Sequence, residues 1–333
     1  MSKFVVREIE NHERDTWDEF VMRSRQGTLF HTSGWCETLR RALAPAEPVI
    51  LGCFEGSDLV GGCVFLERER FGMRTAVTPL LTPYSGFLSE PPLAEKLSDN
   101  VSREHAILEA LCAYLLDSYT YLNLVLAPHL EDIRPLQQAG FNISPRFTYY
   151  LNMRLSAEEH WRRFDGSARR QIKKAERQQW ELSSRLPLDL AYELFAGNFA
   201  RRGESCPVSY ELFIAAAEHR GPDRLREVFA VWHGERLAGF VVVLGYNRTL
   251  YYALAAHDAE YLSHGVSSFL VWEIIKRYSG VEWFTFDFVG ANIPSIARFK
   301  ENFNPRLQLY FQVEHYGSSF LKLGKGLLDR VRS

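Results

Sequence analysis

The predicted strands and helices of this chain occur in an order that repeats once. In the first half, strand-like runs at residues 49–54 and 59–68 flank the turn EGSD, and a third strand is predicted near residues 76–80. A helix, a strand, a helix and a strand follow, at residues 103–118, 121–127, 130–139 and 147–155. One such unit uses about half of the 333 residues, so the chain has room for two.

The second half has the same order of elements. Helices are predicted around residues 157–178, 188–201 and 210–219, before strands at 227–233, 236–246 and 249–255. The turn HGE between the first two strands matches EGS in the first half by position. A helix, a strand, a short helix and a last strand complete the unit, at residues 266–278, 281–288, 295–303 and 307–315. We therefore predict an α/β (α+β) fold with two domains, residues 1–150 and 151–333.

The composition is that of a globular protein, and its net charge does not favour binding of a polyanion. Hydrophobic residues make up 46% of the chain and charged residues 24%, and the 14% of aromatic residues favours large cores and ligand-lined clefts. The formal net charge of −2 provides no overall basic field. Stable DNA binding is therefore not expected, and any polyanion must meet a local basic patch.

Disulfides, metal sites and membrane spans are not expected. The five cysteines are scattered without a CxxC pair, and the ten histidines show no HExxH or HxH arrangement. The N-terminus lacks the apolar region of a signal peptide, and the apolar run at 237–246 is far too short to cross a membrane. The sequence predicts a cytoplasmic protein.

The segment FDFVGANIPSIARFKENFNP, residues 286–305, gathers charge where a strand ends. Asp287 ends the apolar strand, Gly290 and Asn292 form a turn, and Arg298 and Lys300 follow. Open α/β sheets place their ligands at such strand ends. The alternative is that Asp287 caps the turn and that Lys300 is a solvated surface lysine.

A basic helix is predicted in the segment SARRQIKKAERQQWEL, residues 167–182. Its basic residues recur at helical spacing on one face: Arg170, Lys173, Lys174 and Arg177. Such a face could bind the phosphates of a nucleotide-linked precursor or of a tRNA acceptor arm. The alternative is a solvated face balanced by Glu176 and Glu181.

Four motifs together resemble the FemABX group of tandem GNAT-like enzymes, also called FemAB-like or BioF2-like proteins. They are FHTSGW at 30–35, FTYYLNM at 147–153, the basic segment at 167–182, and HGVSSFLVWEIIK followed by the segment at 286–305. The resemblance implies two GNAT-like (acyl-CoA N-acyltransferase-like) domains, with the active site in the second. It also implies an N-acyltransferase that moves an aminoacyl or acyl group to an amine of a cell-envelope precursor, a peptidoglycan or polysaccharide component.

The resemblance also implies a place for the donor. In acyl-CoA-dependent GNAT enzymes the N-terminus of the corresponding helix holds a pyrophosphate, which implies phosphate or cofactor binding at four residues: Gly265, Val266, Ser267 and Ser268. Gly265 would let the ligand approach the backbone. Leu262 stands where the family has a basic or amide residue, and this departure argues against tight coenzyme A binding. We expect no tightly bound cofactor, and a donor that is either aminoacyl-tRNA or acyl-CoA.

The family pattern further implies catalytic and substrate-binding residues. Lys300 would meet the carbonyl oxyanion or a phosphate-ester oxygen, and Asp287 would orient the acceptor amine or accept its proton. A structural salt bridge between them, holding the turn, is the alternative. Substrate contacts are predicted at five further residues: Arg298, Tyr252, Tyr149, Arg170 and Lys173.

Three functions stay open at this point. The first is an aminoacyltransferase or related N-acyltransferase, the second an acyl-CoA-dependent GNAT N-acetyltransferase, and the third a non-catalytic binding protein on a degenerate GNAT scaffold. The predicted partners are a small-molecule or lipid-linked envelope precursor and charged tRNA. The C-terminal segment FLKLGKGLLDRVRS pairs apolar with basic residues and predicts at most peripheral membrane contact.

Overall fold

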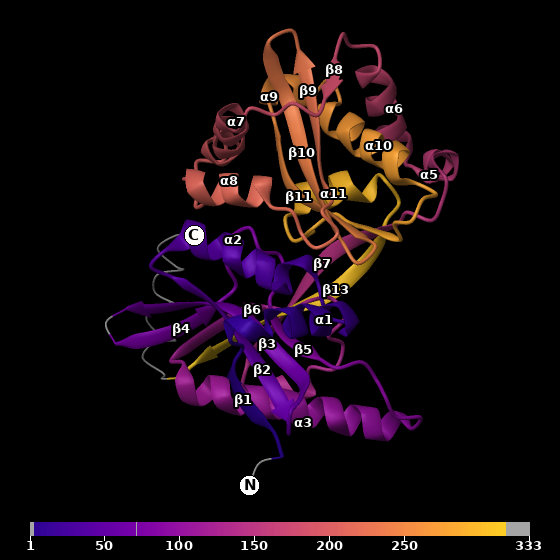
Figure 1. Ribbon diagram of the computed structural model, residues 1–333. Helices are drawn as coiled ribbons and strands as arrows, with labels where there is room; N and C mark the ends of the chain where they lie inside the picture. Colours follow the sequence, from indigo (N-terminus) through magenta and orange to yellow (C-terminus); the bar gives the residue numbers. More distant parts are fainter. Residues whose placement is uncertain (1–2, 71, 318–333) are drawn as a thin grey trace. The chain divides into compact units, whose positions relative to one another are not determined.

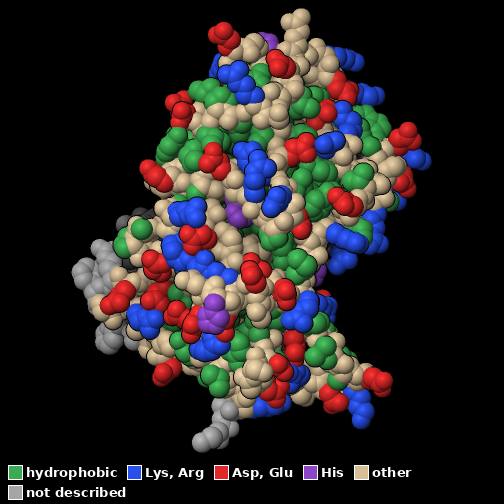
Figure 2. Space-filling view, viewed as in Figure 1, with side chains coloured by type: hydrophobic (Ala, Val, Ile, Leu, Met, Phe, Trp, Pro, Cys, Tyr) green, Lys and Arg blue, Asp and Glu red, His purple; other side chains and the backbone are tan. Residues whose placement is uncertain are grey.

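The computed structural model describes residues 3–70 and 72–317, which form two units (Figure 1). Unit 1 consists of residues 3–146 and 310–317, and unit 2 of residues 147–309. The C-terminal segment with predicted membrane contact lies outside the described residues. On the face shown in Figure 2, acidic and basic side chains are interspersed, in keeping with the small net charge.

The strands of unit 1 form one sheet in the order β1-β2-β3-β4-β6-β13, with β5 also paired to β3. Their bounds are Val5–Glu8 (β1), Glu47–Glu55 (β2), Asp58–Arg70 (β3), Met73–Val77 (β4), Gly86–Ser89 (β5), Tyr121–Val125 (β6) and Arg306–Tyr316 (β13). Strands β4 and β6 are parallel, and the other described pairs are antiparallel. The predicted hairpin at EGSD is confirmed, since Glu55 pairs with Asp58 around a Gly56 with φ 62°.

Helices cover both faces of the unit 1 sheet. Figure 1 shows α3 (Leu97–Ser118) on one side and α1 (Arg14–Arg23) with α2 (Ser33–Leu43) on the other. Two 3-10 helices, η1 (Asn11–Glu13) and η2 (Leu29–His31), and the short α4 (Arg134–Gln138) complete the unit. The buried stripe of α3 carries Ile107, Leu111 and Leu115, whose helical spacing turns them toward the apolar sheet residues.

The strands of unit 2 follow the order β7-β12-β11-β10-β9-β8. Their bounds are Asn142–Asn152 (β7), Thr285–Asp287 (β12), Thr249–His257 (β11), Arg236–Tyr246 (β10), Arg226–His233 (β9) and Glu181–Ser183 (β8). Strand β10 is buried from its second residue to its last, because helices cover both of its faces. The parallel pair is β11 with β12, and the other described pairs are antiparallel.

The helices of unit 2 lie on the two faces of this sheet. In Figure 1, α10 and α6 lie on one side of β9–β11, and α7 with α8 on the other. The helix bounds are Ala157–Arg163 (α5), Gly166–Ala175 (α6), Leu188–Ala200 (α7), Tyr210–Glu218 (α8), Ala259–Leu262 (α9), Val266–Tyr278 (α10) and Pro294–Glu301 (α11). Helix α10 packs on β9, β10 and α6, and α7 packs on β10 and β11.

The predicted repeat of elements is confirmed. Each unit has three antiparallel strands, then a long helix, then a strand parallel to the third: β2, β3, β4, α3 and β6 in unit 1, and β9, β10, β11, α10 and β12 in unit 2. A shorter helix follows each parallel strand, α4 in unit 1 and α11 in unit 2. The fold class is therefore a mixed α/β fold with two similar units.

The last strand of each repeat belongs at least partly to the other unit. Strand β7 follows α4 of the first repeat, yet its residues 150–152 pair with β12 of unit 2. Strand β13 follows α11 of the second repeat, yet its residues 312–316 pair with β6 of unit 1. The expected division into consecutive domains at 150/151 is therefore corrected, because residues 310–317 complete the sheet of the first unit.

Two predicted elements differ in extent. The helix expected at 157–178 is two helices, since Phe164 is extended and the Asp165 side chain accepts the Ser167 N–H as the N-cap of α6. The strand expected at 281–288 is paired over Thr285–Asp287 alone. Val281 is 52% exposed and has no strand partner among the described residues, so its apolar character reflects neither pairing nor burial.

All five cysteines are free thiols, and four of them are buried. Burial raises the pKa of Cys36, Cys53 and Cys112 to about 12, so these thiols stay protonated. Among residues 3–70 and 72–317, no group of three or more His, Cys, Asp or Glu side chains is placed to hold a metal ion. In the same part of the chain, no helix has both the length and the apolar character needed to cross a bilayer.

Candidate active site in unit 2

The parallel strands β11 and β12 of unit 2 end at different distances along the sheet. Three pairs join them, and the last is Tyr251 with Asp287, where β12 ends. Strand β11 continues to His257. Open α/β sheets bind ligands outside the carboxyl ends of their parallel strands. The candidate site therefore lies at this edge, between residues 288–292 after β12 and the start of α10 after β11.

Asp287 is fully buried and caps the turn that follows it. Its Oδ1 accepts hydrogen bonds from the Thr148 hydroxyl at 2.7 Å and from the Val289 N–H at 2.8 Å. The Thr148 hydroxyl oxygen in turn accepts the Gly290 N–H at 3.0 Å. The alternative in which Asp287 caps the turn thus describes its contacts. Its predicted catalytic role stays a prediction.

Lys300 is directed into the protein and is not a solvated surface lysine. Its Nζ donates to the carbonyl oxygens of Phe288 at 2.7 Å, Val289 at 3.3 Å and Gly290 at 2.5 Å. An ammonium group has three hydrogens, so these carbonyls use its donor capacity. Burial lowers the pKa of Lys300 to about 8, against the charge of Asp287, which raises it. Direct contact of Lys300 with an oxyanion would require one carbonyl to be released.

The turn at 288–290 has an unusual backbone conformation. Val289 and Gly290 have φ values of 53° and 83°. A β-branched residue in this left-handed region costs on the order of 1–3 kcal/mol, and such strain is typical of functional sites. Asn292 fixes the far end of the turn, because its Oδ1 accepts the Phe147 N–H at 2.9 Å and its Nδ2 donates to the Phe147 carbonyl at 3.3 Å.

Tyr252 follows Tyr251, the last residue of β11 that pairs with β12, and lies at the same edge. Its ring centroid is 6.1 Å from that of Phe286 and 6.2 Å from that of Phe288. Burial raises the pKa of Tyr252, so the phenol stays protonated at neutral pH. Within the described part of the chain, its hydroxyl makes no hydrogen bond, although the ring is only partly exposed. The hydroxyl is therefore available to a ligand as a donor.

The start of α10 is covered by helix α6. Gly265 has a φ of 86°, and a Cβ atom on it would lie 2.3 Å from the carbonyl oxygen of Gln171. The absence of a side chain at Gly265 thus accommodates the backbone of α6, and ligand binding at this glycine stays a prediction. Phe269 N–H donates to Gly265 O, so the amides of the three preceding residues have no helical acceptor: Val266, Ser267 and Ser268. Of these three residues, Ser267 alone is partly exposed.

Helix α6 is basic and has no acidic residue. Its charged residues are Arg169, Arg170, Lys173 and Lys174, and no ion pair joins them to any acid among the described residues. Lys174 Nζ donates to the carbonyl of Ser263 at 2.8 Å, beside the start of α10. Lys173 Nζ lies 6.0 Å from the Trp161 ring. Arg170, Lys173 and Lys174 are exposed, as the alternative of a solvated face expects, but no ion pair joins them to Glu176 or Glu181.

The other predicted substrate residues have separate positions. Tyr149 donates its hydroxyl hydrogen to Glu301 at 2.7 Å, and burial and this bond raise its pKa to about 12. Its carbonyl accepts the Phe288 N–H, so Tyr149 belongs with Asp287 and Lys300 around the turn. Arg298 and Arg170 are exposed. Thr148 is the residue that the sequence did not indicate, because a threonine in FTYYLNM is ordinary for a strand.

Comparisons with known proteins agree with this architecture. Residues 162–301 match a family described as an acetyltransferase (GNAT) domain, a range that includes β11, α10, β12 and α11. No curated protein matches the chain by sequence.

Three solved structures have a similar fold. The structure of FemX has a TM-score of 0.65 and 13% identity, and the match covers 92% of this chain and 96% of FemX. The C-terminal domain of a protein described as a lysylphosphatidylglycerol synthetase of Agrobacterium fabrum has a TM-score of 0.55, 10% identity and 92% coverage of each chain. A tandem GNAT protein from the clavulanic acid biosynthesis pathway has a TM-score of 0.53 and 12% identity, with coverage of 95% of this chain and 99% of that one.

At these identities the three structures show the fold. The predicted resemblance to tandem GNAT-like proteins is confirmed, and both units take part in it. Residues 162–301 thus match a GNAT domain family, and the chain as a whole has the fold of FemX.

Proposed function

We propose that the chain is an N-acyltransferase that moves an aminoacyl or acyl group to an amine of a cell-envelope precursor. The observation that carries the proposal is the GNAT match at residues 162–301. This range includes the sheet edge at which β11 extends beyond the end of β12. The similarity to FemX over 92% of the chain supports a substrate from the cell envelope. The proposed acceptor is a peptidoglycan or polysaccharide precursor, either a small molecule or linked to a lipid.

Acyl transfer to an amine needs a donor of hydrogen bonds to the developing oxyanion. The Tyr252 hydroxyl meets this need in the proposal, because it lies at the strand edge, stays protonated and has no partner in the described part of the chain. Asp287 and Lys300 position the turn that borders the same edge. In this proposal their role is to hold the turn, in place of the direct substrate contacts that the resemblance implies, because both side chains make hydrogen bonds within the turn region.

Two observations favour aminoacyl-tRNA over acyl-CoA as the donor. The first turn of α10 is largely buried under α6, which leaves little room for a pyrophosphate. Helix α6 carries four basic residues without internal ion pairs, and each can neutralise a phosphate of a polyanion. We propose that Arg170 and Lys173 contact the donor.

The test is a transfer assay with purified protein. Seryl-, alanyl- and lysyl-tRNA are compared with acetyl-CoA as donors, and nucleotide-linked muropeptides and amino sugars are the acceptors. The expected result is an acceptor mass increased by one aminoacyl residue. The Tyr252→Phe variant should lower kcat about 100-fold with little change in KM, because the hydroxyl acts in the transition state.

A double variant separates donor binding from chemistry. Arg170→Glu with Lys173→Glu should raise the KM for the charged tRNA more than tenfold and leave kcat nearly unchanged. The matched control is Arg23→Glu, at an exposed basic residue of helix α1 in unit 1. Transfer from acetyl-CoA alone would replace the tRNA proposal by the second function, and binding of an acceptor without transfer from any donor would favour the third.

A further inference from the structure

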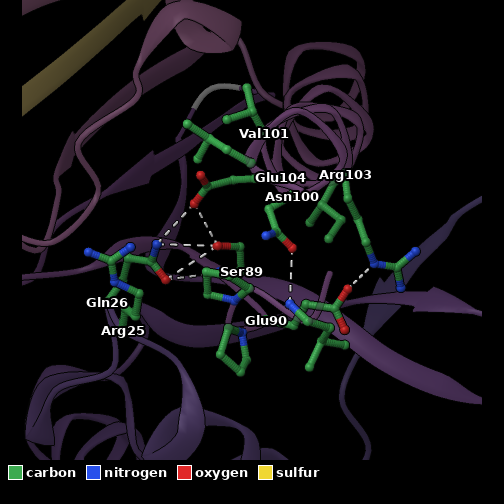
Figure 3. Close-up of a pocket in the computed structure, with 13 residues that line it drawn as sticks. Arg25, Gln26, Ser89, Glu90, Asn100, Val101, Arg103 and Glu104 are labelled. Atoms are coloured by element: carbon green, nitrogen blue, oxygen red, sulfur yellow. Dashed lines mark hydrogen bonds and ion pairs between the residues drawn. The ribbon is translucent and has the colours of Figure 1, made fainter. Parts of the chain in front are cut away.

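Unit 1 contains a cavity of about 100 Å³ that plays no part in the proposed acyl transfer (Figure 3). It lies between the residues after α1, the end of β5 with the loop that follows, and the first half of α3. The lining residues include polar and apolar groups in separate places. The polar groups lie around Ser89, and the apolar groups belong mainly to residues 91–101 and to Ile107.

The polar part of the cavity is an ordered network around the Glu104 carboxylate. Glu104 Oε1 accepts hydrogen bonds from the Ser89 hydroxyl at 2.8 Å and from Gln26 Nε2 at 3.2 Å. Gln26 is fixed in turn, because its Oε1 accepts from the Ser24 hydroxyl at 2.8 Å. Gln26, Ser89 and Ser24 are all buried. The network therefore holds the carboxylate in one orientation.

The second oxygen of this carboxylate has no donor. Figure 3 shows dashed lines from one Glu104 oxygen to Gln26 and Ser89 and none from the other. Within residues 3–70 and 72–317, Glu104 Oε2 makes no hydrogen bond or ion pair. A carboxylate that is held at one oxygen and unpaired at the other is able to accept a hydrogen bond from a cationic ligand.

The other charged groups of the cavity do not neutralise Glu104. Arg103 donates to Glu90 and, at 2.8 Å, to Glu55, so both of these acids are paired. Arg25 is exposed, and the acid that it approaches, at 4.0 Å, is Glu131. Of the two acids that line the cavity, Glu90 is therefore paired with arginine and Glu104 is not.

The apolar part of the cavity is partly open to solvent. Leu93 and Leu97 are 73% and 78% exposed, which is high for leucine, and Pro91 and Pro92 lie beside them in the lining. On α3, residues 97, 101 and 104 recur at i, i+4 and i+7, so apolar side chains and the carboxylate share one side of the helix. A ligand with an apolar body and a charged end would contact both.

We propose that this cavity binds a primary alkylammonium group of the size of a lysine side chain. One water occupies about 10–15 Å³ of such a volume, so the cavity has room for roughly seven to ten waters or for the five non-hydrogen atoms of n-butylamine. The ammonium binds Glu104 Oε2, and the alkyl chain lies against Leu93, Leu97 and Val101. The site belongs to unit 1 and does not depend on acyl transfer in unit 2.

The test is an NMR titration of the full chain with three probes of equal length. We expect n-butylamine at neutral pH to bind with a Kd on the order of 1 mM and to shift the methyl resonances of Leu93, Leu97 and Ile107. The neutral 1-butanol should bind at least tenfold more weakly, and butyrate should not bind. In the series from methylamine to n-butylamine, affinity should rise up to about fourfold for each methylene.

Two variants separate the charge from the apolar contact. Glu104→Gln keeps an oxygen for Ser89 and Gln26 and should weaken n-butylamine binding at least tenfold, whereas Glu109→Gln, at an exposed position on the same helix, should leave it unchanged. Leu97→Ser should weaken binding several-fold without cost to folding, because Leu97 is exposed.

Three results would overturn the proposal. They are equal binding of 1-butanol and n-butylamine, unchanged binding by a folded Glu104→Gln variant, and preferential binding of butyrate, which would indicate an anion site at Arg25. If Glu104→Gln does not fold, the probe series and Leu97→Ser still decide. A failure of acyl transfer in unit 2 affects none of these measurements.

Discussion

The ammonium of Lys300 on helix α11 donates to the carbonyl oxygen of Phe288, directly after strand β12, at 2.7 Å. The same nitrogen also donates to the carbonyl oxygens of Val289 and Gly290. Lys300 is therefore the hydrogen-bond donor to three successive carbonyls of the turn. A buried backbone carbonyl without a donor is costly. The Lys300 ammonium, which the sequence predicted to be catalytic, therefore stabilises the conformation of a strained turn.

Replacing this lysine should cost stability. Lys300→Met keeps the length of the side chain and leaves the three carbonyls without their donor, so we expect a loss of about 3 kcal/mol in the free energy of unfolding. Urea denaturation measures it. Arg298→Met, at an exposed position of the same helix, should change stability by about 0.5 kcal/mol or less. A stable Lys300→Met protein without activity would instead indicate a direct chemical role.

The contribution of Thr148 to stability should come from its hydroxyl group and not from its shape. Thr148→Val conserves the volume but removes the donor to Asp287 and the acceptor for Gly290 N–H, and we expect a loss of about 2–3 kcal/mol. Thr148→Ser keeps the hydroxyl and should cost clearly less. Equal losses in the two variants, measured in urea, would show that the methyl group and not the hydroxyl matters.

Gly265 and Gly280 form a matched pair for testing the contact between α10 and α6. Both have positive φ, 86° and 72°, but an added Cβ would lie 2.3 Å from Gln171 O at Gly265 and would meet no atom within 4 Å at Gly280. Gly280→Ala should cost about 1 kcal/mol for its backbone conformation. Gly265→Ala should cost at least about 2 kcal/mol more, because α6 must move. Similar melting temperatures for the two variants would contradict the close packing.

His257, the last residue of β11, should titrate far below an ordinary histidine. Burial lowers its pKa to about 4, and the positive charge of Arg201 also lowers it. Between pH 4 and the unfolded value near 6.5, the unfolded chain binds a proton that the folded chain does not. The low pKa of His257 therefore makes the free energy of unfolding depend on pH. Its contribution is fully present above pH 6.5 and is lost as the pH falls toward 4, by at most about 1.4 kcal/mol per pH unit.

An NMR titration of the His257 imidazole measures this pKa directly. Arg201→Gln removes the nearby charge and should raise the pKa, whereas Arg202→Gln, the next residue along the chain, should not. A pKa between 6 and 7 in the unmodified protein would show that water reaches the imidazole, whose Nε2 is buried without a hydrogen-bond partner among the described residues.

Local patterns in the sequence predicted the elements well where the signal itself was local. The turns around Gly56 and Gly234 and the helix at 266–278 were found from neighbouring residues, and the structure confirms them. The break between α5 and α6 also had a local signal, the Asp165 N-cap, which the longer basic pattern obscured.

Long-range contacts could not be predicted in this way. The neighbour of Gly265 is Gln171, and the partner of Asp287 is Thr148, in each case a residue far away along the chain. The direction of the Lys300 side chain depends on three carbonyls that no sequence pattern marks. Composition and spacing thus located the candidate site at the end of β12 but did not reveal which groups are free to meet a ligand.

The return of β13 to the first unit has a consequence during protein synthesis. Strand β6 has β4 on one side, and its other edge receives its partner only when residues 312–316 have been made. At translation rates of about 5–20 residues per second, the interval after residue 146 lasts roughly 10 to 30 seconds. Throughout that time the nascent chain exposes an open sheet edge, so its yield in cells should depend on translation speed and on chaperones that cover such edges.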